Sequence, residues 1–135
     1  MHCSCRKALW WAADMAAFTS ARDKSQWSWT AMIMAPDWII AQSFADAMRA
    51  VAAKDRPASL GEVRLETPVE GRCVQTLHQG PYDDEAGVLA EMHDHFIPEA
   101  GLRMSGKHHE IYLDDARRVE PARLRTILRQ PVEDS

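Results

Sequence analysis

The segment GKHHEIYLDD, residues 106–115, places a carboxylate inside an apolar run that is typical of a β-strand. Side chains of a strand alternate between two faces, so His108, Glu110 and Tyr112 share one face, and the opposite face, with Ile111, is expected to contact the core. A carboxyl group surrounded by aromatic side chains loses hydration, which raises its pKa and suits it to general-base catalysis or to pairing with a cation. The alternative for Glu110 is an ordinary surface acid.

The histidines and cysteines do not form a metal-binding pattern. On a helix, His93 and His95 would point about 200° apart, so they could not share an ion. Cys3 and Cys5 form a lone C-x-C pair without a partner pair, which is a weak metal signal. We therefore predict no metal and no cofactor, and we expect His93, which falls on an apolar stripe, to be a core or boundary histidine.

Tryptophan is abundant near the N-terminus: four of the five tryptophans are Trp10, Trp11, Trp27 and Trp29. Most tryptophans belong to a core. Trp10 and Trp11 are consecutive, however, so in a strand they must face opposite sides. One of them then faces away from the helix layer, where a flat ligand or another sheet could cover it.

Composition limits the class of protein. The chain has 135 residues, 46% hydrophobic and 27% charged, which fits one globular domain that needs no disulfide or metal. Three cysteines do not make a disulfide framework. The net charge of −4 and the absence of a coherent basic face argue against nucleic-acid binding. No apolar run approaches the roughly 20 residues of a membrane-spanning helix, and no signal peptide is evident, so we expect a cytoplasmic protein without membrane partners.

Hydrophobic periodicity predicts the elements that position these residues. Residues 25–36 alternate as a strand that ends at Pro36, and residues 36–55 have helical spacing over about five turns. Two short strands, 62–67 and 71–80, are predicted to form a hairpin. A helix follows between Tyr82 and Gly101, and the runs at 107–115 and 122–132 are predicted as the last strands.

This order of elements predicts an α+β fold, an antiparallel sheet with helices packed on one face. The segment from residue 62 onward forms one complete strand and helix module. The segment before it has the strands and aromatic residues of a similar unit, and we interpret it as the partial remnant of a second, pseudo-symmetric module.

Four stretches carry a resemblance to a known family: LWWAADMAAF, WSWTAMIMAPDWI, HQGPYDDE and GKHHEIYLDDARRVEPARLRTILRQPV. They resemble the stand-alone GyrI-like small-molecule-binding family, which is related to the effector-binding domains of MerR- and AraC-type regulators. The resemblance covers nearly all of the chain after about Ala8. It implies a bacterial protein with two pseudo-symmetric modules and a ligand groove between them. We expect a disordered terminus at 1–7, a partial first module at 8–57 and a complete second module at 58–135.

The resemblance also implies the site. Glu110 and Tyr112 fall on the family's HEIYL strand and are the expected catalytic pair, with the glutamate at the centre of the groove. The expected ligand-binding residues are Trp10, Trp11, Trp29, Tyr82 and His108. Some family members are similar to cyclopropyl hydrolases, which open a strained ring by adding water, and others only bind lipophilic or cationic compounds. Either activity makes a lipophilic or cationic small molecule the expected partner.

Two other hypotheses follow from the same residues. The acidic stretch from Asp83 to Glu99 contains no Lys or Arg and could mimic an anionic surface, as in family members thought to antagonise a gyrase inhibitor; the ordinary explanation is a helix N-terminus with a solvated face. Relatives also carry an earlier strand and helix in the first module. A chain that begins near the LWW strand would be a fragment, or would complete its sheet as a homodimer through unpaired strand edges.

Overall fold

The computed structural model describes residues 6–15 and 23–135, so Cys3 and Cys5 lie outside the described residues. The chain divides into two units, which are treated separately here. The first joins the N-terminal segment up to Met34 with Glu70–Ser135 and holds the whole sheet. The second is Ala35–Val69.

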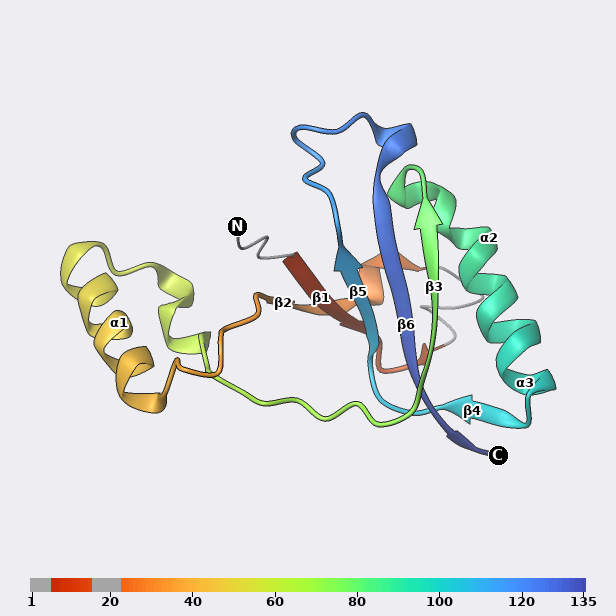
Figure 1. Cartoon of the computed structure of the whole chain (residues 1–135), viewed down its shortest axis with the longest axis horizontal. Helices are drawn as coiled ribbons and strands as arrows, with labels where there is room; N and C mark the ends of the chain where they lie inside the picture. The colour runs from red at the N-terminus through yellow and green to blue at the C-terminus, as the bar shows by residue number, and fades with distance from the viewer. Residues whose placement is uncertain (1–5, 16–22) are drawn as a thin grey trace. The chain divides into compact units, whose positions relative to one another are not determined.

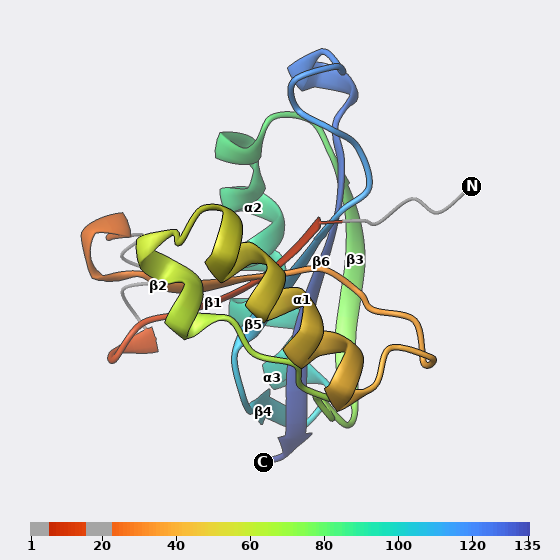
Figure 2. The ribbon, with the colours of Figure 1, turned by 90° about the vertical axis from the view of Figure 1, so that its left-hand side faces the viewer.

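The sheet of the first unit is antiparallel throughout, with the strand order β2, β1, β5, β6, β3 (Figure 1). Its strands are β1 (Arg6–Trp11), β2 (Ser28–Met32), β3 (Cys73–Gln79), β5 (His108–Tyr112) and β6 (Arg125–Asp134). A sixth strand, β4 (Leu102–Met104), pairs with the far end of β6, next to α3 (Figure 2). The predicted α+β class with an antiparallel sheet is confirmed.

A nearly continuous helical segment covers one face of this sheet. It consists of α2 (Glu85–Ala90), a π-helical turn (Glu91–Phe96) and α3 (Ile97–Glu99), and a short 3-10 turn (Tyr82–Asp84) precedes it. The helix ends just before Gly101, as predicted, and Gly101 has the positive φ of 70° that favours glycine at this position. Pro98, which was predicted to close the helix with Gly101, lies inside α3 instead.

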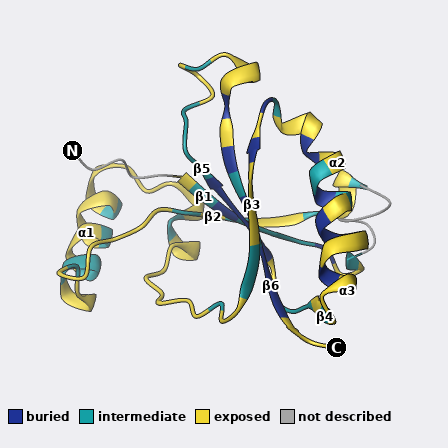
Figure 3. Cartoon of the chain, turned by 45° about the vertical axis from the view of Figure 1, so that its right-hand side comes forward, coloured by how far each residue is buried: buried dark blue, intermediate teal, exposed yellow. Residues whose placement is uncertain are grey.

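The core lies between this helix and the two strands nearest to it. Leu89, Met92 and Ile97 pack against Leu128 and Val132 of β6. Buried residues accordingly gather on the central strands and on the sheet-facing side of α2 (Figure 3). Because Leu128 is the register partner of Glu110, Glu110 projects from the same face of the sheet as the core.

This arrangement corrects the prediction that the face of Ile111 is the core face and the face of Glu110 the polar one. All of His108, His109, Glu110 and Ile111 are buried, so both faces of β5 are covered. The helix packs over the face that carries Glu110. The alternation of side chains correctly predicted which residues of β5 share a face. Because both faces of this strand are buried, its sequence pattern does not indicate which face the helix covers.

The second unit contains α1 (Ala41–Lys54) and a 3-10 helix, Ala58–Glu62. The helix begins at Ala41, later than the predicted start at Pro36, because Pro36 to Ile40 form a turn in which the amide of Ile39 donates to the carbonyl of Pro36. The prediction of a strand at 62–67, and of its hairpin with 71–80, is wrong. Only the second run forms a strand, β3, which pairs with β6 instead.

Two smaller differences concern the ends of elements. Arg6 and Lys7, which we expected in a disordered terminus, begin β1. The short strand β4 was not predicted, because three residues are too few to show an alternating pattern. Within residues 6–15 and 23–135, no helix is both long and apolar enough to cross a membrane.

Candidate functional site

A cavity of about 760 Å³ opens on the face of the sheet that carries Glu110. Strands β1, β2 and β5 supply one side, and the start of the helical segment supplies another. Five aromatic side chains and four carboxyl groups are among its lining residues: Trp10, Trp27, Trp29, Tyr82, Tyr112, Glu85, Glu110, Asp114 and Asp115. The size and the aromatic lining are those of a small-molecule site.

The register of the sheet explains why these residues meet. Trp10 pairs with His108 across β1 and β5, and with Trp29 across β1 and β2. Ala8 pairs with Glu110, and its small side chain leaves space in front of the carboxyl group. Residues that are direct register partners share a face, so three strands together present one continuous wall.

Glu110 is buried, with 7% of its surface exposed, and each of its oxygens has a polar neighbour. The Tyr112 hydroxyl donates to Oε2 at 2.8 Å. The His108 Nε2 lies 3.4 Å from Oε1. Glu85 lines the same cavity, and its interaction with Glu110 contributes to lowering the pKa of Glu110. The carboxyl group is therefore fixed in orientation inside the cavity.

These contacts set the protonation state of Glu110. Burial raises the pKa of Glu110, but its interactions with His108 and the hydrogen bond from Tyr112 together hold the pKa below its usual value. The expected rise through desolvation is thus outweighed. Glu110 is ionised at neutral pH, the form that a general base requires.

Tyr112 links Glu110 to the aromatic wall. Its hydroxyl accepts a hydrogen bond from the Trp10 indole, 3.1 Å away, while it donates to Glu110. Burial and the neighbouring Glu110 carboxylate raise the pKa of Tyr112 far above that of free tyrosine, so Tyr112 remains a neutral donor. The Tyr82 ring packs edge-on against Tyr112, with 5.6 Å between ring centroids.

The tryptophans form the opposite part of the wall. Trp10 lies 5.9 Å from Trp27 and 6.4 Å from Trp29 between ring centroids. Trp29 keeps 62% of its surface exposed, which is unusual for so large an apolar side chain. An exposed indole at a cavity wall is available to stack on a planar ligand.

The charges at the rim are mostly paired. Arg125 makes a bidentate contact with Asp114, and Arg117 does the same with Asp115. Lys24 forms an ion pair with Asp83 at 3.0 Å. Asp114 and Asp115 are thus paired with arginines, and Glu85 and Glu110 are the buried carboxyl groups of the lining.

The structure brings together five of the seven residues predicted for the site: Trp10, Trp29, Tyr82, Glu110 and Tyr112. Trp11 projects from the other face of β1, and the Lys107 ammonium lies 3.6 Å from its ring centroid. His108 is completely buried beneath Glu110 and does not line the cavity. Its contact with Glu110 makes it a supporting residue.

Glu85 and Trp27 are among the lining residues that sequence reasoning missed. Glu85 was interpreted only as a favourable charge at a helix start, although it lies three residues after Tyr82. Trp27 precedes β2 and shares the alternation of Trp29, so a signal for it was present in the pattern.

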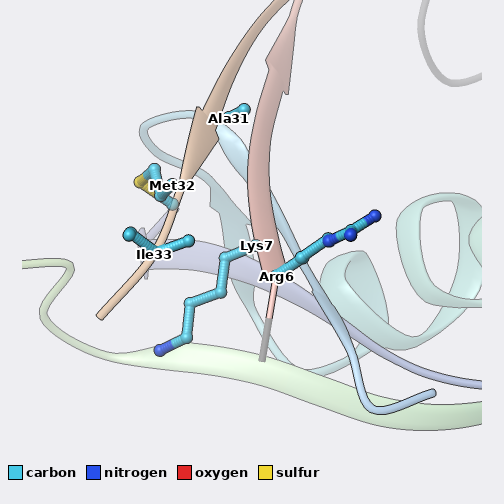
Figure 4. A pocket seen from close by; sticks show the side chains of 5 residues that line it. All are labelled: Arg6, Lys7, Ala31, Met32 and Ile33. Atoms are coloured by element: carbon cyan, nitrogen blue, oxygen red, sulfur yellow. The ribbon is translucent and has the colours of Figure 1, made fainter. Parts of the chain in front are cut away.

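A second, smaller hollow of about 250 Å³ lies beside the first and shares three of its residues (Figure 4). It is lined by Arg6, Lys7, Ala31, Met32 and Ile33. The two basic side chains point in different directions in the figure, and the lining includes no acid, so this hollow has no acid and base pair for catalysis. Among residues 6–15 and 23–135, no group of three or more His, Cys, Asp or Glu side chains could hold a metal ion.

Together, the open antiparallel sheet and the aromatic cavity around a buried glutamate define a small-molecule-binding α+β protein. The model of the GyrI-like small molecule binding domain matches residues 35–133. The chain therefore belongs to this family, as its sequence suggested. Much of the cavity wall, from Arg6 to Ala31, lies before the matched residues.

Solved structures extend the comparison over 96% of the chain. An uncharacterised conserved protein from Listeria innocua is 34% identical with a TM-score of 0.82. Two structures described as hydrolases from the same organism are each 33% identical, with TM-scores of 0.76 and 0.77. The chain spans 62% to 64% of the length of these three proteins. No curated protein matches the chain.

Proposed function

We propose that the protein binds planar, apolar or cationic small molecules in the aromatic cavity and adds water to strained rings, with Glu110 as the general base. The observation that carries the proposal is the buried, ionised Glu110 carboxylate, held by Tyr112 and His108 on the floor of a cavity walled by aromatic side chains. Membership of a small-molecule-binding family and similarity to two proteins described as hydrolases support it.

Each part of the cavity has a role in this reaction. Trp10, Trp29 and Tyr82 stack against the planar part of the substrate and keep water from most of it. Glu110 removes a proton from one water molecule within hydrogen-bond reach, and the water oxygen attacks the ring carbon. The carbon–carbon bond of the ring breaks, its electron pair moves into the conjugated system of the substrate, and the proton taken up by Glu110 passes to that system, so that one water molecule is added in total.

Binding alone would need the same wall but no activated water. The experiment that separates the two uses a neutral, cyclopropane-containing aromatic substrate and follows both tryptophan fluorescence and product formation. Glu110→Gln keeps the shape of the side chain and removes the base. Loss of turnover with unchanged affinity supports catalysis, whereas equal turnover in both proteins would exclude Glu110 as the base.

A second candidate function is binding of a protein partner through the helical segment. Its outer side exposes the carboxylates of Glu91, Asp94 and Glu99, and the Phe96 ring among them is 56% exposed. An apolar ring within an acidic surface is a plausible contact for a basic partner. Pull-down with gyrase, using wild type and Phe96→Ala, tests this candidate; equal or absent recovery would reject it.

A further inference from the structure

The sheet of the first unit ends in two edge strands, β2 and β3, which differ in composition. Each of them pairs with a single neighbour among the strands that the structure describes. The β2 edge is apolar: Trp29 is 62% exposed, and Ile33 and Met34, which directly follow the strand, are 72% and 67% exposed. In β3 the large exposed apolar side chain is Leu77, which stands among threonine, glutamine and histidine. An exposed apolar edge pairs readily with another strand.

The β2 edge also lacks the features that usually prevent pairing between edges. Natural proteins place charged side chains or proline on an edge strand for this purpose. The sequence from Ser28 to Met34 is SWTAMIM, which contains no proline, histidine or charged residue. Each of the other described strands contains at least one charged residue or histidine. When a strand pairs with its own copy, a charge near the two-fold axis lies close to its symmetry mate, so an uncharged strand is suited to pair with itself.

The side chains of β2 complement one another in such a pair. An antiparallel pair centred on Thr30 places the two Thr30 side chains opposite each other, and threonine pairs across strands are favourable. Trp29 then lies opposite the partner's Ala31, so that a large side chain meets a small one. The two-fold axis repeats this match, because Ala31 lies opposite the partner's Trp29.

We propose that a second copy of the chain pairs antiparallel with the β2 edge, about a two-fold axis at Thr30, and that the partner completes the wall of the aromatic cavity. Trp29 and Ala31 both line that cavity and project from the same face of the sheet. A two-fold axis perpendicular to the sheet keeps the cavity faces of both copies on one side. The partner's Ala31 therefore lies beside Trp29, at the margin of the cavity, and covers part of the exposed indole. This assembly does not depend on whether the cavity catalyses a reaction.

Thr30→Lys tests the pairing, because two ammonium groups would then face each other at the axis. Thr30 is not among the lining residues of the cavity, so the ligand site keeps its side chains. Analytical ultracentrifugation of the full chain at several concentrations measures the mass, which is 15.3 kDa for one copy. We expect wild type to approach twice this mass, and Thr30→Lys to raise the dissociation constant of the dimer about tenfold or more. Thr76→Lys, the same change at an exposed position of β3, should match wild type.

Cross-linking tests the register even if Thr30→Lys fails to fold. Directly opposite Cα atoms of an antiparallel pair are about 4.5 to 5.5 Å apart, which a disulfide can span. In a chain whose three cysteines are replaced by serine, Thr30→Cys should form a disulfide-linked dimer on oxidation. Ser28→Cys should not, because the two Ser28 positions would be about 14 Å apart along the paired strands.

Three results would overturn the proposal. A monomer at every concentration would leave the β2 edge to a strand of a different protein. A dimer that Thr30→Lys does not weaken, or that Thr76→Lys weakens equally, would use another surface or respond only to net charge. Cross-linking by Ser28→Cys but not by Thr30→Cys would show that the axis does not lie at Thr30.

Discussion

Strand β5 carries two adjacent histidines, and each contacts a glutamate on a different face of the sheet. On the cavity face, His108 contacts Glu110. On the reverse face, the Nδ1 of His109 lies 2.7 Å from Glu70. The two pairs are alike in composition and in burial of the histidine, but their surroundings differ in one respect.

Arg129 forms an ion pair with Glu70, whereas among residues 6–15 and 23–135 no Lys or Arg forms an ion pair with Glu110. Arg129 donates to Glu70 at 3.1 Å and to Gln75 at 2.9 Å, so its guanidinium joins β6 to the segment before β3. Burial raises the pKa of Glu70, but the hydrogen bonds from His109 and Arg129 outweigh it and keep the group ionised. Glu110 depends on a histidine and a tyrosine, and it adjoins a cavity. The comparison indicates that Glu70, whose charge is balanced by Arg129, stabilises the fold. Glu110, which is held by a histidine and a tyrosine beside a cavity, is available to a ligand.

The largest expected effect concerns cationic ligands. Glu110→Gln should weaken binding of a planar monocation by about 3 kcal/mol, more than a hundredfold, because a buried ion pair loses one partner. A neutral analogue of the same shape should bind nearly as before. Fluorescence titration of the five tryptophans measures both affinities.

The matched control is Glu70→Gln, which removes the glutamate of the reverse face. If Glu70→Gln weakened binding of the cation as much as Glu110→Gln does, the effect would come from the net charge of the protein. The distinction between the two faces of the sheet would then be wrong.

For the free energy of unfolding we expect the opposite order, with a larger loss in Glu70→Gln than in Glu110→Gln. Glu70→Gln should lower the free energy of unfolding by about 2 kcal/mol, because Arg129 and His109 would each lose a charged acceptor in a partly buried site. Urea denaturation followed by circular dichroism measures this change. The exposed Glu120→Gln should have almost no effect, and equal losses in the two variants would contradict the structural role of Glu70.

Acidification should destabilise the cavity face through His93, whose ring packs edge-on against His108 with 6.0 Å between centroids. Burial, reinforced by His108, lowers the pKa of His93 to about 4. A histidine with a lowered pKa in the folded state takes up its proton preferentially when unfolded. Its contribution to stability is therefore complete above about pH 6.5 and declines as pH falls toward 4.

Between pH 7 and pH 5 the contribution of His93 to the free energy of unfolding should fall by about 2 kcal/mol. Urea denaturation at the two pH values checks it, with His93→Leu showing a smaller dependence on pH than wild type. The exposed His95→Gln should behave like wild type; the same dependence in His93→Leu would show that other groups control acid stability.

The smallest expected effect compares the two faces of the β1 and β2 hairpin. Trp29→Ala should weaken binding of a planar aromatic ligand by about 1 kcal/mol, because one stacking surface is removed. Trp11→Ala, on the opposite face, should leave the affinity unchanged. Isothermal titration calorimetry measures both affinities. A larger loss of affinity in Trp11→Ala would mean that the ligand binds to the face of the sheet opposite to the cavity, which would contradict the proposal.

Local patterns in the sequence predicted more of the fold than of the site. The alternation in residues 107–115 and 122–132 gave β5 and β6, and the apolar spacing after Tyr82 gave the helix that ends near Gly101. The prediction failed at 62–67: this run forms no strand, although β3, which pairs with β6 on one side, is the edge strand of the sheet. A short alternating run is therefore not sufficient by itself for a strand.

The sequence alone determined which residues share a face, since side-chain alternation is a local property of the backbone. It therefore grouped Glu110 with Tyr112 and separated Trp10 from Trp11. Only the tertiary structure decided that the helix covers the face of Glu110, that Glu85 lines the same cavity and that His108 is completely buried next to Glu110. These facts depend on the register between strands and on helix packing, which join residues distant in the chain and leave no periodic signal in either segment.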